Sequence, residues 1–161
     1  MIQKKNKVYN GKNISVNMYD ILFRNKKFQR EIIEQSSASA VLAFEGNNVL
    51  LVKQHRFPHG FVLEIPAGTL DKNENPKVCA IREFIEETGY KPKKIKHLID
   101  YYPFIGYNTQ KIHCYVAQEI EKISERKLEY DEFMTLVKID FKKLLKMITS
   151  GKIIDSKTIC A

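Results

Sequence analysis

The residues best suited to chemistry are glutamates in one segment, residues 68–90, which read GTLDKNENPKVCAIREFIEETGY. Glu83, Glu86 and Glu87 stand at positions i, i+3 and i+4, so a helix would place all three on one face. Like charges at these spacings repel each other by roughly 0.2–0.5 kcal/mol per pair. Mg²⁺ among them would offset this repulsion, because it prefers oxygen ligands and is often held by one or two carboxylates together with phosphates. The pattern favours a Mg²⁺ site over the simpler alternative, a solvated acidic face.

Signals for a loop and a helix surround these glutamates. Asn75 and Pro76 predict the helix start, as an N-cap followed by proline at the first helical position. Gly89 suits the helix C-cap, where the backbone often turns left-handed, and Gly68 is expected to allow a tight turn into the loop. Capping and charge together indicate one loop–helix unit.

The two faces of this helix are expected to differ. Val78, Ile81 and Ile85 are predicted to pack into the core on the side opposite the glutamates. Arg82 precedes Glu86 by four residues, so the two side chains are expected to form an ion pair that orients the acidic group.

The segment resembles the Nudix box, G-x(5)-E-x(7)-R-E-U-x-E-E-x-G-U, in which U is a bulky apolar residue. Every fixed position is matched, and Phe84 and Tyr90 fill the U positions. The resemblance implies hydrolysis of a diphosphate linked to another group, with Mg²⁺ as the cofactor and Mn²⁺ as a substitute. It also implies that Glu74 and Arg82 stabilise the loop–helix unit.

The same resemblance assigns roles to the acidic residues. Glu83 and Glu87 would bind the metal, often with the carbonyl of Ala67, and Glu86 would assist metal binding or activate a water molecule. The implied metal ligands are therefore Ala67, Glu83, Glu86 and Glu87. The implied catalytic residues are Glu86, Glu83, Glu87 and Arg82.

Length and composition set broad bounds. A chain of 161 residues suits a single domain, and no apolar run approaches the roughly 20 residues that span a bilayer. The first residues, MIQKKNKVYNG, are basic without a following apolar stretch, so we do not expect a secretory signal. Three widely spaced cysteines indicate a reducing cytoplasm. The net charge of +8 favours anionic partners such as nucleotides, but the lysines are scattered, so we expect no nucleic acid and no membrane partner.

The remaining pattern predicts strands with a few helices. The expected strands are an N-terminal group within residues 7–34, with a hairpin turn at Asn10–Gly11, and then 38–44, 49–56, 61–66, 95–102, 111–117 and 133–139. Residues 141–150 are expected to form a helix with Leu144, Leu145 and Ile148 on its apolar face, followed by a short helix from Ser156. This indicates an α/β fold, with a mixed β-sheet sandwiched between α-helices and an N-terminal antiparallel strand extension, as in the Nudix fold.

The resemblance extends beyond the box. Residues 49–71, VLLVKQHRFPHGFVLEIPAGTLD, are similar to the segment that precedes the box in ADP-ribose pyrophosphatases and related nucleoside diphosphate sugar hydrolases. Arg56 is a candidate to bind the diphosphate or the terminal ribose, because a guanidinium can hold a phosphate with two bonds; the alternative is a surface arginine. Glu64 is a candidate to contact a base or sugar, or else pairs with a nearby lysine.

One segment departs from that subgroup, which typically carries Ser-Pro-Gly and then an acidic residue downstream of the box. Here Ile105 replaces the proline and Gln110 the usual glutamate, so Gln110 is a candidate to hydrogen-bond the substrate but cannot act as a carboxylate base. The general base stays open among Glu86, Glu119, Glu121 and Glu125. The aromatic residues of this region are expected mainly in the core or a dimer interface, with base stacking as the alternative: Tyr101, Tyr102, Phe104 and Tyr107.

Together these features predict Mg²⁺-dependent hydrolysis of ADP-ribose or another nucleoside diphosphate sugar to a nucleoside monophosphate and a sugar phosphate. The alternatives are a pyrophosphatase acting on nucleoside triphosphates or dinucleoside polyphosphates, and a non-catalytic nucleotide-binding module. In the resembled subgroup the early strands build the subunit interface. We therefore expect a single domain in which residues 1–36 form a homodimer interface and residues 37–161 form the Nudix core.

Overall fold

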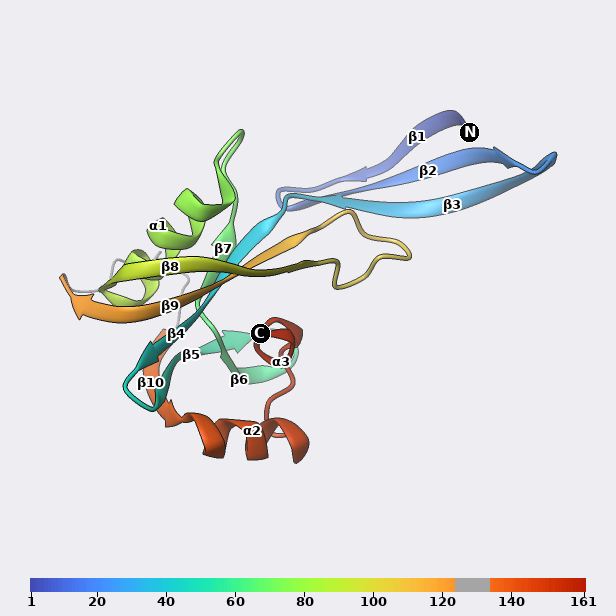
Figure 1. Cartoon of the computed structure of the whole chain (residues 1–161). Helices are drawn as coiled ribbons and strands as arrows, with labels where there is room; N and C mark the ends of the chain where they lie inside the picture. The colour runs from blue at the N-terminus through green and yellow to red at the C-terminus, as the bar shows by residue number, and fades with distance from the viewer. Residues whose placement is uncertain (124–133) are drawn as a thin grey trace. The chain divides into compact units, whose positions relative to one another are not determined.

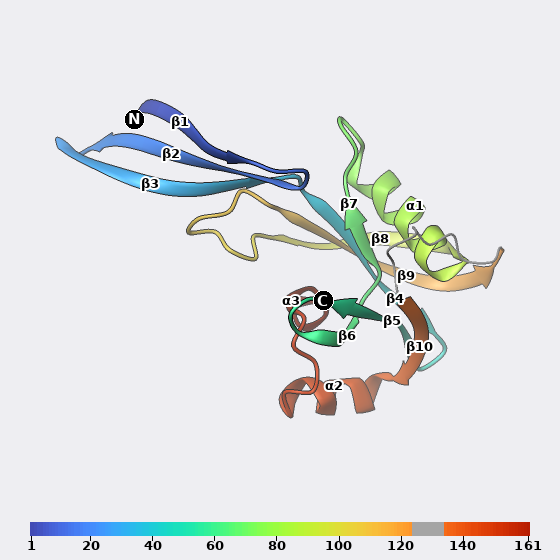
Figure 2. The same ribbon diagram turned by 180° about the vertical axis from the view of Figure 1, so that it is seen from behind.

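The computed structural model describes residues 1–123 and 134–161 of the chain. These residues divide into two compact units: residues 1–37 with 101–112, and residues 38–100 with 113–161. Figures 1 and 2 show the chain from opposite sides. Segment 101–112 groups with the N-terminal strands, although no local pattern in its sequence indicates this.

The first unit is built on a three-stranded antiparallel sheet. Its strands, in spatial order, are β1 (Ile2–Asn10), β2 (Ile14–Phe23) and β3 (Lys26–Gln35). The predicted N-terminal strands are therefore confirmed. Every residue of β1 is exposed, and its apolar side chains Ile2 and Val8 are 61% and 66% exposed. This strand consequently contributes little buried apolar surface within one chain.

The turns of this sheet differ from the prediction. The two-residue turn lies between β2 and β3, where Arg24 and Asn25 have positive φ angles of 49° and 59°. Two-residue hairpin turns of the mirror-image type require positive φ at both positions. At the predicted turn Asn10 still pairs with β2, and a longer loop is closed by a 2.9 Å hydrogen bond from Gly11 N–H to the Ile14 carbonyl.

Segment 101–112 lies along β3. The Ile33 N–H donates to the Tyr107 carbonyl at 2.7 Å, and the Thr109 N–H donates to the Ile33 carbonyl at 3.0 Å. The rings of Phe104 and Tyr107 are stacked with centroids 5.7 Å apart, and each side chain is about half exposed. The expectation of a core position is therefore wrong for these two aromatic residues within one chain.

The second unit contains a mixed sheet that is seven-stranded among the described residues. Its strands are β4 (Ala38–Glu45), β5 (Asn48–Arg56), β6 (Gly60–Glu64), β7 (Ala67–Thr69), β8 (Tyr90–Tyr101), β9 (Ile112–Lys122) and β10 (Met134–Asp140). The spatial order is β10-β5-β4-β9-β8, with β6 paired to β5 and β7 paired to β4. The sequence predicts every one of these strands except β7, although β8 and β9 are longer than expected.

Helices cover both sides of this sheet, as predicted (Figure 1). Helix α1 (Pro76–Thr88) lies on one side, and α2 (Phe141–Thr149) and α3 (Ser156–Cys160) lie on the other. Asp140 and Asp155 cap the starts of α2 and α3 through side-chain oxygens that accept backbone N–H bonds. In the part of the chain that the structure describes, no helix is both long and apolar enough to span a bilayer.

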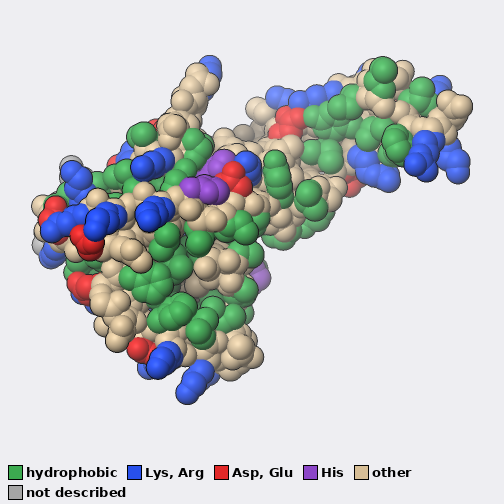
Figure 3. Space-filling view, viewed as in Figure 1, with side chains coloured by type: hydrophobic (Ala, Val, Ile, Leu, Met, Phe, Trp, Pro, Cys, Tyr) green, Lys and Arg blue, Asp and Glu red, His purple; other side chains and the backbone are tan. Residues whose placement is uncertain are grey.

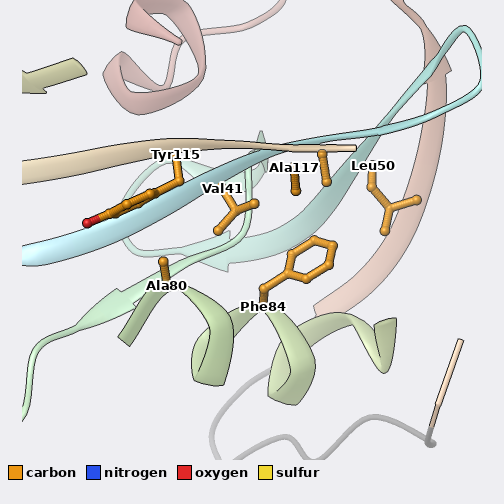
Figure 4. Close-up of a cluster of buried hydrophobic side chains, with 7 residues drawn as sticks. Val41, Leu50, Ala80, Phe84, Tyr115 and Ala117 are labelled. Carbon is orange, nitrogen blue, oxygen red and sulfur yellow. The ribbon is translucent and has the colours of Figure 1, made fainter. Parts of the chain in front are cut away.

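The core beneath α1 differs from the predicted one. Ala80 and Phe84 pack against strands β4, β5 and β9, through Val41, Leu50 and Tyr115 (Figure 4). The predicted apolar face is wrong in part, because Val78 is 56% exposed and Ile81 and Ile85 are only half-buried. The buried face runs instead through Ala80, Phe84 and Glu87, since α1 also packs on β7, next to its acidic side. In α2, likewise, Leu144 is buried but Leu145 is 46% exposed.

The edge strand β8 carries the densest run of lysines. Figure 3 shows Lys and Arg side chains gathered over this strand. Two of them pair with β9: Lys93 Nζ lies 3.3 Å from Glu121 and Lys94 Nζ lies 2.5 Å from Glu119. Charged side chains on an edge strand discourage it from pairing with another chain.

Candidate active site

The ends of α1 form as the sequence predicts. The Asn75 side chain accepts a hydrogen bond from the Lys77 N–H, and Pro76 is the first helical residue. Gly89 ends the helix with φ of 76°, a left-handed conformation that glycine adopts without strain. These two caps set the first and last residues of α1, the helix that carries the acidic residues.

Arg82 is the centre of the acidic group. It donates to Glu74 through Nε and Nη2 at 2.9 and 2.8 Å, and to Glu83 through Nη1 at 2.7 Å. The predicted pair with Glu86 is confirmed at 3.3 Å. Hydrogen bonds from Arg82 lower the pKa of the Glu74 carboxyl from 4.5 to about 2, and the bonds to Glu74 raise the pKa of Arg82. Both groups therefore stay charged near neutral pH, and Arg82 fixes the loop to the helix.

Gly68 is needed for a reason other than the predicted one. Its φ angle is not among the positive ones, and it lies in β7, paired with Ser39 of β4. A Cβ at this position would meet the Glu83 carboxyl carbon at 1.9 Å and both carboxylate oxygens at 2.2 Å. Only glycine lets the Glu83 carboxylate lie against the backbone of β7.

Glu87 is held by the residue before Gly68. The Ala67 N–H donates to Glu87 Oε2 at 3.0 Å, and Glu87 is 4% exposed. In comparison, the side chains of Glu83 and Glu86 are 18% and 41% exposed. The three predicted metal-binding glutamates thus range from buried to open, and Glu86 is the one most accessible to a water molecule.

The carboxylates of Glu83, Glu86 and Glu87 are oxygen ligands of the kind that a hard cation prefers. They lie within two turns of one helix and beside one strand. Within residues 1–123 and 134–161, however, no group of three or more His, Cys, Asp and Glu side chains converges closely enough to hold an ion. Arg82 bonds both Glu83 and Glu86. A cation would therefore compete with Arg82 for oxygens of these two carboxylates.

Cys79 also contacts this site, although no motif in the sequence indicates it. Its Sγ lies 3.6 Å from the Gly68 carbonyl and 3.7 Å from Arg82 Nη2, and it is fully buried. Burial raises the pKa of the Cys79 thiol to about 12, and likewise raises that of Cys114 to about 11. Both thiols are protonated at neutral pH, and all three cysteines of the chain are free.

The second predicted group, Arg56 and Glu64, forms a two-bond ion pair. Arg56 Nε and Nη2 donate to the two oxygens of Glu64 at 2.8 and 2.9 Å. Lys157 of α3 also donates to Glu64, at 3.1 Å, so the predicted alternative of pairing with a lysine is present. The bonds to Glu64 raise the pKa of Arg56, and the negative charge of Glu87 contributes to this rise. Arg56 therefore lies within electrostatic reach of the acidic helix.

Other predicted residues have partners of their own. Gln110, in the first unit, donates from Nε2 to the Ser36 carbonyl at 3.2 Å. Of the candidate bases, Glu119 and Glu121 belong to strand β9, and each pairs with a lysine of β8. Glu125 lies outside the described residues.

Comparison with known proteins identifies the family of this chain. A model of the NUDIX domain matches residues 34–153. The ADP-ribose pyrophosphatase of Bacillus subtilis (strain 168) is 35% identical over 161 residues, covering 98% of this chain and 87% of the relative. The methanol dehydrogenase activator of Bacillus methanolicus is 35% identical over 162 residues, with 98% and 88% covered. The GDP-mannose pyrophosphatase of Salmonella paratyphi B is 32% identical over 155 residues, with 88% and 81% covered.

A solved structure supports the fold. The crystal structure of an ADP compounds hydrolase matches 100% of this chain and 89% of its own with a TM-score of 0.86, at 18% sequence identity. Together with the domain match and the relatives, this shows that the chain belongs to the Nudix family.

Proposed function

We propose that this Nudix hydrolase cleaves the diphosphate of a nucleoside diphosphate sugar, releasing a nucleoside monophosphate and a sugar phosphate. Two kinds of relative support the substrate class, since one is named for ADP-ribose and another for GDP-mannose. The observation that carries the proposal is the group formed by Glu83, Glu86 and Glu87 on α1, with Glu83 lying against Gly68.

In this proposal the metal ion is bound by three glutamates of α1 and one backbone carbonyl. Glu83, Glu86, Glu87 and the Ala67 carbonyl would hold Mg²⁺, or Mn²⁺ in its place. When bound, such an ion neutralises charge on the diphosphate and lowers the pKa of a coordinated water. Arg82, which donates to Glu83 and Glu86, would hold these two carboxylates in position until the ion binds.

Glu86 is the proposed general base. Its carboxylate takes a proton from the water whose oxygen attacks phosphorus, while the bridging oxygen leaves with the other phosphate. Its greater exposure, 41% against 18% and 4% for the neighbouring glutamates, supports this assignment. Arg56 would bind the diphosphate or the terminal ribose through N–H groups not used by Glu64, and Gln110 stays a candidate for a substrate hydrogen bond.

We also propose a homodimer formed through residues 1–36. The fully exposed strand β1, with exposed apolar side chains such as Ile2 and Val8, supports this proposal. A cytoplasmic location would suit the three free thiols. Sedimentation as a monomer at micromolar concentration would refute the dimer.

The substrate proposal is tested by product analysis. Purified protein with Mg²⁺ is incubated with ADP-ribose, GDP-mannose, UDP-glucose, a dinucleoside polyphosphate and a nucleoside triphosphate, and products are separated by anion exchange. We expect a nucleoside monophosphate and a sugar phosphate from at least one sugar nucleotide, and a loss of at least 100-fold in Glu87→Gln. Preferential cleavage of triphosphates would contradict the substrate class, and nucleotide binding without turnover would contradict catalysis.

A further inference from the structure

A network of four charged side chains joins the C-terminal helix to the sheet. Arg56 of β5 bonds Glu64 of β6 through two bonds, at 2.8 and 2.9 Å. Lys157 Nζ lies 3.1 Å from Glu64 Oε2 and 2.6 Å from Asp155 Oδ1. Two cations thus face two anions, and Lys157 and Glu64 are 93 residues apart in the chain. The Nudix box contains none of these residues.

Glu64 is the buried centre of this network. It is only 3% exposed, and a buried carboxylate is costly unless charges and hydrogen bonds satisfy it. Burial raises the pKa of Glu64, but the bonds from Arg56 and the charge of Lys157 outweigh it and leave the pKa below its ordinary value. Glu64 therefore remains an anion that two cations hold in place.

The ion pair leaves one edge of the Arg56 guanidinium open. A guanidinium has five N–H donors, and Glu64 takes one from Nε and one from Nη2. The Arg56 side chain is 44% exposed although its partner carboxylate is 4% exposed. The buried carboxylate thus fixes the plane of the guanidinium, and the described residues offer its remaining N–H groups no hydrogen-bond acceptor.

Helix α3 has a second bond to the chain directly after β6. The Ile65 N–H donates to Thr158 Oγ1 at 2.9 Å, and Thr158 in turn donates to Asp155 Oδ2 at 2.7 Å. Thr158 is 4% exposed and Ile65 is 1% exposed, so water does not compete for this bond. The position of Lys157 relative to Glu64 is therefore set by a buried hydrogen bond one residue away on each side.

We propose that Lys157 is a positioning residue for substrate binding: it holds the Glu64 carboxylate so that Glu64 presents the open edge of Arg56 to the anionic substrate. This inference rests on the proposed function, in which Arg56 binds the diphosphate or the terminal ribose. Lys157 acts through Glu64 and does not itself contact the substrate. A positioned arginine contributes to binding more than to the chemical step, so its loss raises KM more than it lowers kcat.

The test compares three lysine variants. Lys157→Met keeps the length of the side chain but removes the charge, Lys157→Arg restores a cation, and Lys152→Met is the matched control at an exposed lysine. With the sugar nucleotide that the wild type cleaves, we expect KM to rise about 10-fold in Lys157→Met with kcat within about threefold. Lys157→Arg should recover most of the affinity, and Lys152→Met should match the wild type.

A readout independent of turnover separates this inference from the proposed function. In the NMR spectrum, the Nε–H resonance of Arg56 is assigned by its loss in Arg56→Lys. It should be sharp in the wild type and in Lys152→Met. It should shift and broaden in Lys157→Met and in Lys157→Gln, the second variant being a safeguard if the first does not fold. An unchanged resonance, or an unchanged KM in folded Lys157→Met, would overturn the inference. If the wild type cleaves no sugar nucleotide, the proposed function fails, while the resonance still decides whether Lys157 positions Arg56.

Discussion

Replacement of Gly68 by alanine tests the acidic site at its closest contact. The added Cβ would lie 1.9 Å from the Glu83 carboxyl carbon, whereas non-bonded carbons lie about 3.5–4.0 Å apart. The carboxylate must therefore move by about 1.6 Å or more. Such a shift breaks the 2.7 Å bond from Arg82 and displaces a proposed metal ligand.

The structure predicts a large effect on catalysis and a small one on stability. Misplacement of a reacting group by about 1 Å can cost about 100-fold in rate, which corresponds to about 2.7 kcal/mol. The displaced atoms are the far end of a flexible side chain, so the fold itself need not change. We expect the free energy of unfolding to change by about 1 kcal/mol or less, or about 2–4 °C in Tm for a chain of this size.

The assay measures kcat/KM for the preferred sugar nucleotide, Mn²⁺ binding by calorimetry, and Tm. Thr69→Ala is the control, because it changes the exposed next residue of the same strand and adds no atom near Glu83. We expect Gly68→Ala to lose at least 30-fold in kcat/KM and to bind Mn²⁺ more weakly, with Thr69→Ala within about twofold of the wild type. A folded Gly68→Ala protein with activity within twofold of the wild type would refute the role given to this contact.

The buried face of α1, the Glu74–Arg82 pair and the burial of the cysteines can each be measured. In urea unfolding, Phe84→Ala should lower the free energy of unfolding by about 3–5 kcal/mol and Val78→Ala by less than about 0.5 kcal/mol. A larger loss for Val78→Ala would mean that the face of α1 predicted from the sequence is the buried one. Glu74 has a folded pKa of about 2, below its ordinary 4.5, so its stabilisation is present above pH 4.5 and is lost as pH falls toward 2. The Tm of Glu74→Gln should therefore fall less steeply over that range, and parallel Tm curves would contradict this. A thiol reagent should modify only exposed Cys160 in the native protein and all three cysteines in urea; three rapid reactions would contradict the burial.

Features determined by neighbouring residues could be predicted from the sequence. The caps of α1, at Asn75 and Gly89, depend on side chains and φ angles within a few residues, and both form as expected. The pair of Arg82 with Glu86 follows from helical spacing alone. Strand positions in the second unit were predicted for the same reason, since alternation and turn residues are local signals.

Features determined by distant parts of the chain could not be predicted in this way. The face of α1 that is buried depends on β7 packing beside it. The apolar side chain of Val78 is therefore exposed, and the charged side chain of Glu87 is buried. The role of Gly68 appears only when Glu83 lies against it. Lys157 has no local signal either, because its partner Glu64 lies 93 residues away. Hydrophobic periodicity reports neither the packing of one element on another nor ion pairs across the fold.

Mn²⁺ binding measured by electron paramagnetic resonance tests the central claim most directly. Free Mn²⁺ is titrated with the wild type and with the double variant Glu83→Gln, Glu87→Gln, each checked for an unchanged Tm. The wild type should remove Mn²⁺ signal with saturation, and the double variant should bind at least 10-fold more weakly and show no sugar nucleotide cleavage. Equal Mn²⁺ binding by the two proteins would contradict the assignment of these glutamates as metal ligands.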